Sequence, residues 1–143
     1  MLYGHTVQDT RHMFFESWRK HLQRCPLTPL EAKLVNVIQQ HPEYHALLAQ
    51  QDPDADYSPE QGESNPFLHM GLHLAIRDQV AMDRPFGMQR VYQQLLKRYG
   101  DPHRVEHLLL EPLADCIWLA QKQQRAPDEQ AYLQACQDLV TAY

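Results

Sequence analysis

The sequence predicts an all-α fold, a helical bundle of about six helices with one long polar loop. Apolar residues recur at spacings of three and four along most of the chain, which is the period of an amphipathic helix. A capping side chain followed by proline recurs at candidate helix starts, and only 5 of the 143 residues are glycine. No segment alternates polar and apolar residues as a half-buried strand does. The length fits one domain, so we expect a single helical domain over residues 1–143.

Two helices are predicted before the polar loop, over residues 9–23 and 29–49. Residues 28–31 read Thr-Pro-Leu-Glu, which combines an N-cap threonine, a first-turn proline and a capping-box glutamate. Pro42 lies inside the second range and lacks a backbone donor, so we expect a kink or a break there.

Four more helices are predicted after the loop. Asn65 and Asp101 each cap a start that continues with proline, and Asp128 follows a proline at the last start. Pro112 predicts a second kink or break, and Trp118 is expected in the core. The predicted ranges are 66–83, 87–99, 102–124 and 128–141.

The polar stretch at residues 50–65 predicts a loop longer than most connections in compact domains. Its aspartates alternate from Asp52 to Asp56, and Glu63 falls where an EF-hand loop has its bidentate glutamate. Tyr57, however, occupies the position at which that loop needs glycine for a sharp turn. We therefore interpret the stretch as a solvated acidic loop rather than a calcium site.

The composition limits the classes of function. Thirteen basic and 18 acidic residues give a net charge of -5, which argues against nucleic acid or an anionic membrane as a partner. No apolar run approaches the roughly 18–20 residues of a membrane span, and the first residues lack a signal-peptide pattern. Three cysteines lie far apart without a Cys-x-x-Cys motif, which is typical of reduced thiols. We expect a cytoplasmic protein.

Histidine carries the main functional signal. Six of the nine histidines form pairs spaced by four residues, where chance would give about half of one such pair. Four residues make about one helical turn, so the two rings of a pair project side by side from one helix face. The pairs are His41 with His45, His69 with His73, and His103 with His107, and Glu111 continues the third row.

These histidines share the apolar faces of their predicted helices. Leu72 and Ile76 fall in the row of His69 and His73, so this pair points inward. A buried imidazole without hydrogen-bond partners costs about 1–3 kcal/mol, and six of them would exceed the stability of a small domain. A transition metal removes much of that cost, because it binds one ring nitrogen while the other donates to a carboxylate or carbonyl.

We therefore predict an interior metal site. Its predicted ligands are His41, His45, His69, His73, His103, His107 and Glu111. Imidazole and carboxylate without thiolate suit iron or zinc first, and also manganese or nickel. This set has more ligands than one tetrahedral zinc ion can bind. It therefore suits either two metal ions or one metal ion with some of the residues left uncoordinated. A carboxylate that accepts a hydrogen bond from the second ring nitrogen of a histidine would hold that ring in place. The candidates for this role are Glu31, Glu43, Glu106 and Asp115.

The alternative function is a metal-free helical interaction or scaffold protein with a hydrogen-bonded histidine core. The sequence names no small-molecule substrate and leaves open whether the protein is an enzyme. In a catalytic site, an open coordination position would activate water or oxygen. A homodimer through an apolar helix face is a further expectation.

Three blocks of the chain resemble a known family. They are residues 41–45, residues 65–76 and residues 103–111, and residues 14–20 and 29–32 fit as well. The order and spacing of these blocks resemble the bacterial family numbered 1841 among the domains of unknown function, over nearly the whole chain. The resemblance implies a small cytoplasmic protein and implies no activity.

A second resemblance concerns ligand spacing alone. The pair His69 and His73, and His107 with Glu111, resemble the ligand spacings of hemerythrin-type di-iron bundles and of DinB-like metal-dependent bundles. The chain departs from them at Pro42 and lacks a fourth helix with histidine followed by aspartate. The likeness concerns the site and the architecture, and it implies no inherited function.

Overall fold

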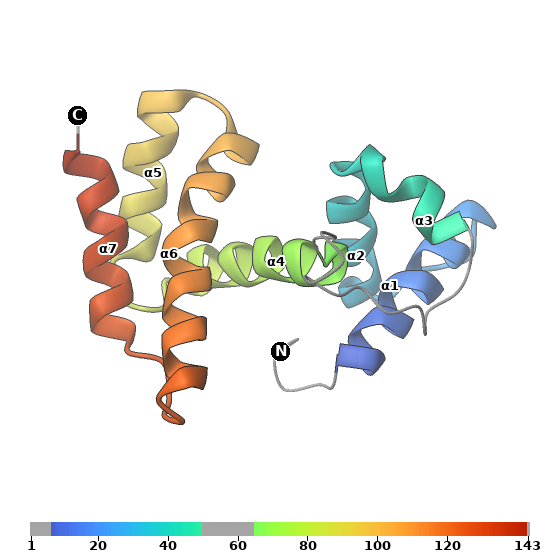
Figure 1. Ribbon diagram of the computed structural model, residues 1–143. Coiled ribbons are helices and arrows are strands. Elements are labelled where there is room, and N and C mark those ends of the chain that lie inside the picture. The colour runs from blue at the N-terminus through green and yellow to red at the C-terminus, as the bar shows by residue number, and fades with distance from the viewer. Residues whose placement is uncertain (1–6, 50–64, 143) are drawn as a thin grey trace. The chain divides into compact units, whose positions relative to one another are not determined.

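A computed structural model describes residues 7–49 and 65–142 of the chain (Figure 1). Its regular elements are helices, and the described ranges contain no strand, so the predicted all-α class is confirmed. The elements are α1 (Val7–Leu22), α2 (Pro29–Gln39), the short 3-10 helix η2 (Pro42–Tyr44), α3 (His45–Ala49), α4 (Pro66–Met82), α5 (Met88–Tyr99), α6 (Pro102–Lys122) and α7 (Glu129–Thr141). No helix in this part of the chain is long and apolar enough to cross a membrane.

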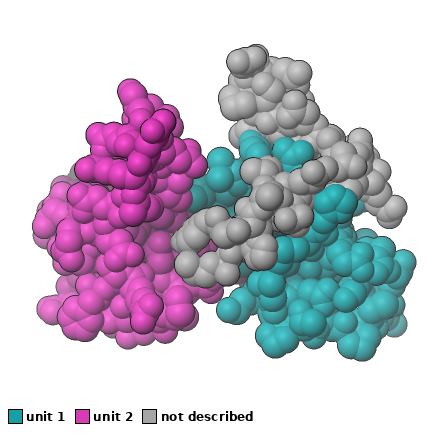
Figure 2. Space-filling view, turned by 90° about the horizontal axis from the view of Figure 1, so that it is seen from below, with its two compact units in different colours: residues 1–74 teal, residues 75–143 magenta. Residues whose placement is uncertain are grey.

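The chain divides into two compact units, residues 1–74 and residues 75–143, which Figure 2 colours separately. In the described part, unit 1 holds α1, α2, η2, α3 and the first half of α4. Unit 2 holds the second half of α4 together with α5, α6 and α7. The single domain expected from the length stays a prediction. Apart from Asn65, the predicted polar loop at 50–65, with the acidic residues compared to a calcium loop, lies outside the described residues.

The break predicted at Pro42 is present, and it splits the predicted helix 29–49 into separate elements. A proline disfavours helical backbone angles in the residue that precedes it. His41 accordingly has φ -126° and ψ 65°, which lie outside the helical region. Pro42 then opens η2, and α3 begins at His45. Pro112 behaves differently, because α6 runs through it from Pro102 to Lys122. The prediction of a break at this proline is therefore wrong. The residues Leu109 and Leu113, on either side of it, are both buried on one face of the helix.

The helix starts predicted from local sequence are confirmed. In the capping box of α2, Thr28 Oγ1 accepts from the Glu31 backbone N–H at 3.2 Å and Glu31 Oε1 accepts from the Thr28 N–H at 2.9 Å. The side chains of Asn65, Asp101 and Asp128 each accept a hydrogen bond from a backbone N–H in the first turn of α4, α6 and α7.

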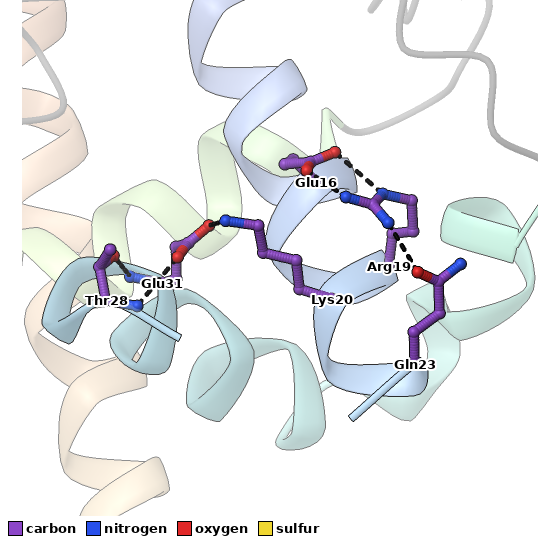
Figure 3. Close-up of polar contacts among 6 residues, drawn as sticks. All are labelled: Glu16, Arg19, Lys20, Gln23, Thr28 and Glu31. Carbon is purple, nitrogen blue, oxygen red and sulfur yellow. Dashed lines mark hydrogen bonds and ion pairs between the residues drawn. The ribbon is translucent and has the colours of Figure 1, made fainter. Parts of the chain in front are cut away.

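Glu31 also joins α2 to α1. Its second carboxylate oxygen lies 2.8 Å from the Lys20 ammonium, as Figure 3 shows. The Lys20 ammonium and the Thr28 N–H hold the pKa of Glu31 below its ordinary value. Farther along α1, Arg19 pairs with Glu16 and donates to the Gln23 side chain in the same view.

The core of unit 1 lies between α1, α2, α3 and the start of α4. The Phe14 and Phe67 rings lie 5.9 Å apart between centroids, so the start of α4 packs directly against α1. This contact and the Asn65 cap fix where α4 begins. The buried core residues are Phe14, Trp18, Leu34, Val35, Val37, Ile38, Leu48, Phe67, Met70 and Leu74.

In unit 2, α5, α6 and α7 pack side by side (Figure 1). Their buried side chains include Met88, Val91, Leu95, Val105, Leu109, Leu113, Tyr132 and Cys136. Gly100 ends α5 with φ +75°, a left-handed cap that glycine adopts without strain. The prediction that Trp118 is a core residue is wrong, because it is 59% exposed. It lies away from the α6 face that buries Leu109 and Leu113, and the Lys122 ammonium sits 4.8 Å from its ring centroid.

Removing the capping box should destabilise the protein. We expect Thr28→Ala to lower the free energy of unfolding by about 1 kcal/mol, because it removes the acceptor for the Glu31 N–H. Urea denaturation followed by circular dichroism measures the change. Thr28→Ser is the matched control, since it keeps the hydroxyl and should unfold close to the wild type. Equal midpoints for the alanine variant and the wild type would contradict the capping role.

The Cys136 thiol should be chemically inert in the native protein. All three cysteines are described and are free thiols, and burial raises the pKa of Cys136 to about 11. Because the thiol has a higher pKa in the folded state than in the unfolded state, it contributes to stability at pH values below the unfolded pKa of about 8.5. That contribution to stability is lost as the pH rises through about 11. At pH 8 we expect iodoacetamide to label the partly exposed Cys25 first and Cys136 only in denaturant, as read by mass spectrometry. Native labelling of Cys136 at the rate of Cys25 would contradict its burial.

Candidate metal centre

Three histidines of unit 1 lie together. His41 follows α2, and His69 and His73 are one turn apart on α4. One ring nitrogen from each lies within 4.8 Å of those of the other two. The ring centroids are 5.1 Å apart for His41 and His69, 4.7 Å for His41 and His73, and 4.8 Å for His69 and His73. We call these three residues the unit 1 histidine cluster.

The orientation of His41 is set by the end of α2. Its ring is only 1% exposed, and Nδ1 lies 2.7 Å from the Val37 carbonyl oxygen. A carbonyl oxygen only accepts, so Nδ1 carries the proton and donates. In the neutral ring, Nε2 then holds the lone pair. Metal-binding histidines in proteins have the same arrangement, with the remote N–H donated to a carbonyl or carboxylate.

His69 and His73 point their Nε2 atoms at one another, 3.3 Å apart. His73 is fully buried and His69 is half-buried. Two nitrogens bound to one metal at about 2.0–2.1 Å in tetrahedral geometry also lie about 3.3 Å apart. The separation therefore fits either one hydrogen bond between the two rings or two nitrogen ligands of one cation.

Tyr44 belongs to this cluster, and the sequence analysis missed it. Its ring stacks on His41 at 5.7 Å with 8° between the planes, and it meets the edge of His69 at 6.4 Å. Burial raises the pKa of Tyr44 above its ordinary value. Its position in the block 41–45 was the only sequence signal. The stacking itself needs the turn at η2, which brings Tyr44 back over His41.

The structure does not bring His45 into the cluster. Its Nε2 lies 2.9 Å from the Ile38 carbonyl oxygen, and its ring packs on Trp18 with centroids 4.7 Å apart. The prediction that His41 and His45 share one helical face is therefore wrong. The break at Pro42 places His41 in the turn before η2 and His45 at the start of α3.

In unit 2, His103 and His107 are paired on α6. Their Nε2 atoms are 3.0 Å apart and their ring centroids 4.5 Å apart. A ligand atom of His103 also lies within 4.8 Å of a carboxylate oxygen of Glu106. Glu111 continues the row but is exposed, and it lines a groove of about 460 Å³ between α6 and α7. Its role as a ligand stays a prediction.

Glu106 is a buried carboxylate of unit 2. It is 6% exposed and accepts two hydrogen bonds from Arg77, at 3.0 Å from Nε and 3.2 Å from a terminal guanidinium nitrogen. This side-on pair holds the carboxylate in one orientation. The other carboxylates considered for that supporting role lie elsewhere, because Glu43 and Asp115 are exposed and Glu31 is engaged by Lys20 and Thr28.

The chain matches a known protein family. A protein-family model described as a domain of unknown function (DUF1841) matches residues 6–138. No curated protein and no solved structure matches the chain.

The Arg77–Glu106 pair should be strongly coupled. We expect Arg77→Met to lower the free energy of unfolding by about 2–3 kcal/mol, because it leaves a buried carboxylate without its partner while Arg77 itself is partly exposed. The double variant Arg77→Met with Glu106→Leu should regain most of that loss. Urea denaturation of the four proteins in the cycle measures the coupling. The control Arg90→Met removes an exposed arginine and should be neutral. Additive effects of the two substitutions would contradict the coupling.

Proposed function

Since the chain belongs to the DUF1841 family, whose description states no activity, we propose its function from the geometry: it binds a transition-metal ion. The proposed ligands are His41, His69 and His73 of the unit 1 histidine cluster. The observation that carries the proposal is the convergence of three imidazoles, one from the turn after α2 and two from α4, and two of the three are buried.

The chemistry of the donor set supports this proposal. The Val37 carbonyl fixes the tautomer of His41, so that its Nε2 is the nitrogen that carries the lone pair with which a neutral imidazole binds a cation. The Nε2 separation of His69 and His73 matches that of neighbouring ligands on one metal. Three neutral imidazoles suit zinc or iron first, and also manganese or nickel. Three protein ligands leave at least one coordination position for water or a substrate, which is the arrangement of catalytic rather than closed structural zinc sites.

The competing function is a metal-free scaffold or interaction protein with a hydrogen-bonded histidine core. The His45–Ile38 hydrogen bond favours it, because it shows one imidazole of unit 1 satisfied by the backbone alone. The 3.3 Å contact of His69 and His73 also fits a shared proton. The two functions differ in their response to a chelator, since only a bound metal adds stability that removal of the metal would abolish.

Two further proposals accompany this function. The three free thiols support a cytoplasmic location.

The exposed apolar side chains of Trp118 and Leu119 on α6 support a homodimer through an apolar helix face. The likeness to hemerythrin-type and DinB-like bundles stays a prediction at the level of ligand spacing.

Elemental analysis of protein purified without an affinity tag or added metal tests metal binding. We expect at least about one equivalent of a transition metal in the wild type, and about one equivalent less in the double variant His69→Ala with His73→Ala. The matched control, His12→Ala with His21→Ala, also removes two histidines but lies on α1, and it should keep the full metal content.

Thermal denaturation with a chelator supplies the second readout. The melting temperature of the wild type should fall when the chelator is added and recover with metal, and the His69→Ala, His73→Ala variant should not respond. A wild type free of metal, with a melting temperature indifferent to chelator and to added zinc or iron, would overturn the proposal in favour of the histidine core.

A further inference from the structure

We propose that α6 forms the interface of a homodimer, in which two copies of the chain pack α6 against α6 in antiparallel orientation about a two-fold axis. The indole of Trp118 from each copy enters the groove between α6 and α7 of the other copy. The inference rests on the homodimer proposed above, for which it names the surface and the register, and it is independent of metal binding. All the residues that it uses lie in unit 2.

The outward face of α6 carries one stripe of exposed side chains, at intervals of four, three and four residues. This is the spacing of a single helix face. The stripe consists of Glu111, Asp115, Trp118 and Lys122. Trp118 is 59% exposed, and Leu119 beside it is 41% exposed. Because interfaces combine aromatic side chains at the centre with a polar rim, this face has the composition of an interface.

The groove beside the stripe has the chemistry that an indole needs. It lies between α6 and α7 and has a volume of about 460 Å³. Apolar side chains such as Leu119, Ala135 and Leu139 line it, and the carboxylate of Asp115 lines it as well. An indole has a large apolar surface and one N–H donor, so the apolar walls match its faces and the carboxylate can accept from its N–H. Trp118 of the same chain does not line the groove, so the indole must come from a second copy.

The order of charges along the stripe favours an antiparallel pair. The acidic residues Glu111 and Asp115 precede Trp118, and the basic residue Lys122 follows it at the end of α6. In an antiparallel pair centred between residues 116 and 117, Glu111 lies opposite Lys122 of the partner subunit, and Asp115 lies opposite Trp118 of the partner subunit. A two-fold axis repeats each contact, and opposite charges across an interface fix its register. A parallel pair in register would instead place like charges together.

Sedimentation equilibrium of the full chain tests the interface. We expect the wild type to form a dimer, and Trp118→Ala to raise the dimer Kd by about thirtyfold or more, because a tryptophan that fills a pocket dominates interface energies. Trp118 is exposed within one chain, so its removal leaves the core intact, and circular dichroism confirms the fold. Phe86→Ala is the matched control, since Phe86 is an aromatic residue of the same unit that is 87% exposed, and it should leave the dimer Kd unchanged.

Charge reversal tests the antiparallel register. Glu111→Lys and Lys122→Glu each place like charges opposite one another at both ends of the interface, so each variant alone should dimerise about tenfold or more weakly at low ionic strength. A mixture of the two variants restores opposite charges at both ends, and we expect it to form a one-to-one heterodimer. A chain that carries both substitutions should dimerise like the wild type.

The outcomes separate the inference from the homodimer on which it rests. A wild type that stays monomeric at millimolar concentration would overturn both, and it would leave the α6 face to a partner of another kind. A dimer whose Kd is unchanged by Trp118→Ala would overturn the inference alone, since the homodimer would then form through another surface. Charge variants that fail to associate when mixed would contradict the antiparallel packing.

Discussion

The end of α2 is the constraint on which the histidine cluster of unit 1 depends. Pro42 cannot continue the helix as a donor, and His41 before it adopts a non-helical backbone. That geometry lets the His41 ring donate back to the Val37 carbonyl, and it turns the opposite edge of the ring toward α4. If the helix continued, His41 and His45 would stay on one face and pack alike. Instead, His41 faces two histidines and His45 packs on Trp18.

The position of α4 supplies the other half of the cluster. Asn65 caps its first turn, and Phe67 packs between the aromatic residues of α1. With the start of α4 fixed in this way, the helical period places His69 and His73 one turn apart. A polar cluster therefore lies on an apolar frame, because the side chains that hold α4 against α1 are phenylalanines. Rigid support of this kind is what a ligand set needs to keep its geometry.

Local signals predicted the helices well. The capping box at Thr28 and the caps at Asn65, Asp101 and Asp128 involve atoms at most three residues apart, so their sequence patterns carry the whole interaction. The histidine pairs on α4 and α6 were predictable for the same reason, since each is one helical turn.

Contacts between elements were not predictable in this way. The sequence assigned His45 to a pair with His41, but the turn at η2 replaced that pair by a contact with α4. Glu106 was one of several carboxylates considered, and only the fold shows that Arg77 from another helix holds it. Trp118 has a large apolar side chain of the kind that cores usually bury. Its exposure depends on which face of α6 is covered by α5 and α7. Such outcomes depend on packing between helices, which spacing along one helix does not encode.

Anomalous X-ray diffraction from crystals of the untagged protein tests metal binding by the unit 1 histidine cluster most directly. Data collected at the iron and zinc absorption edges identify the element and its position together. We expect an anomalous peak about 2.0–2.3 Å from one ring nitrogen of each of His41, His69 and His73. Well-ordered rings with no peak among them, in protein never exposed to chelator, would contradict metal binding and would establish a hydrogen-bonded histidine core.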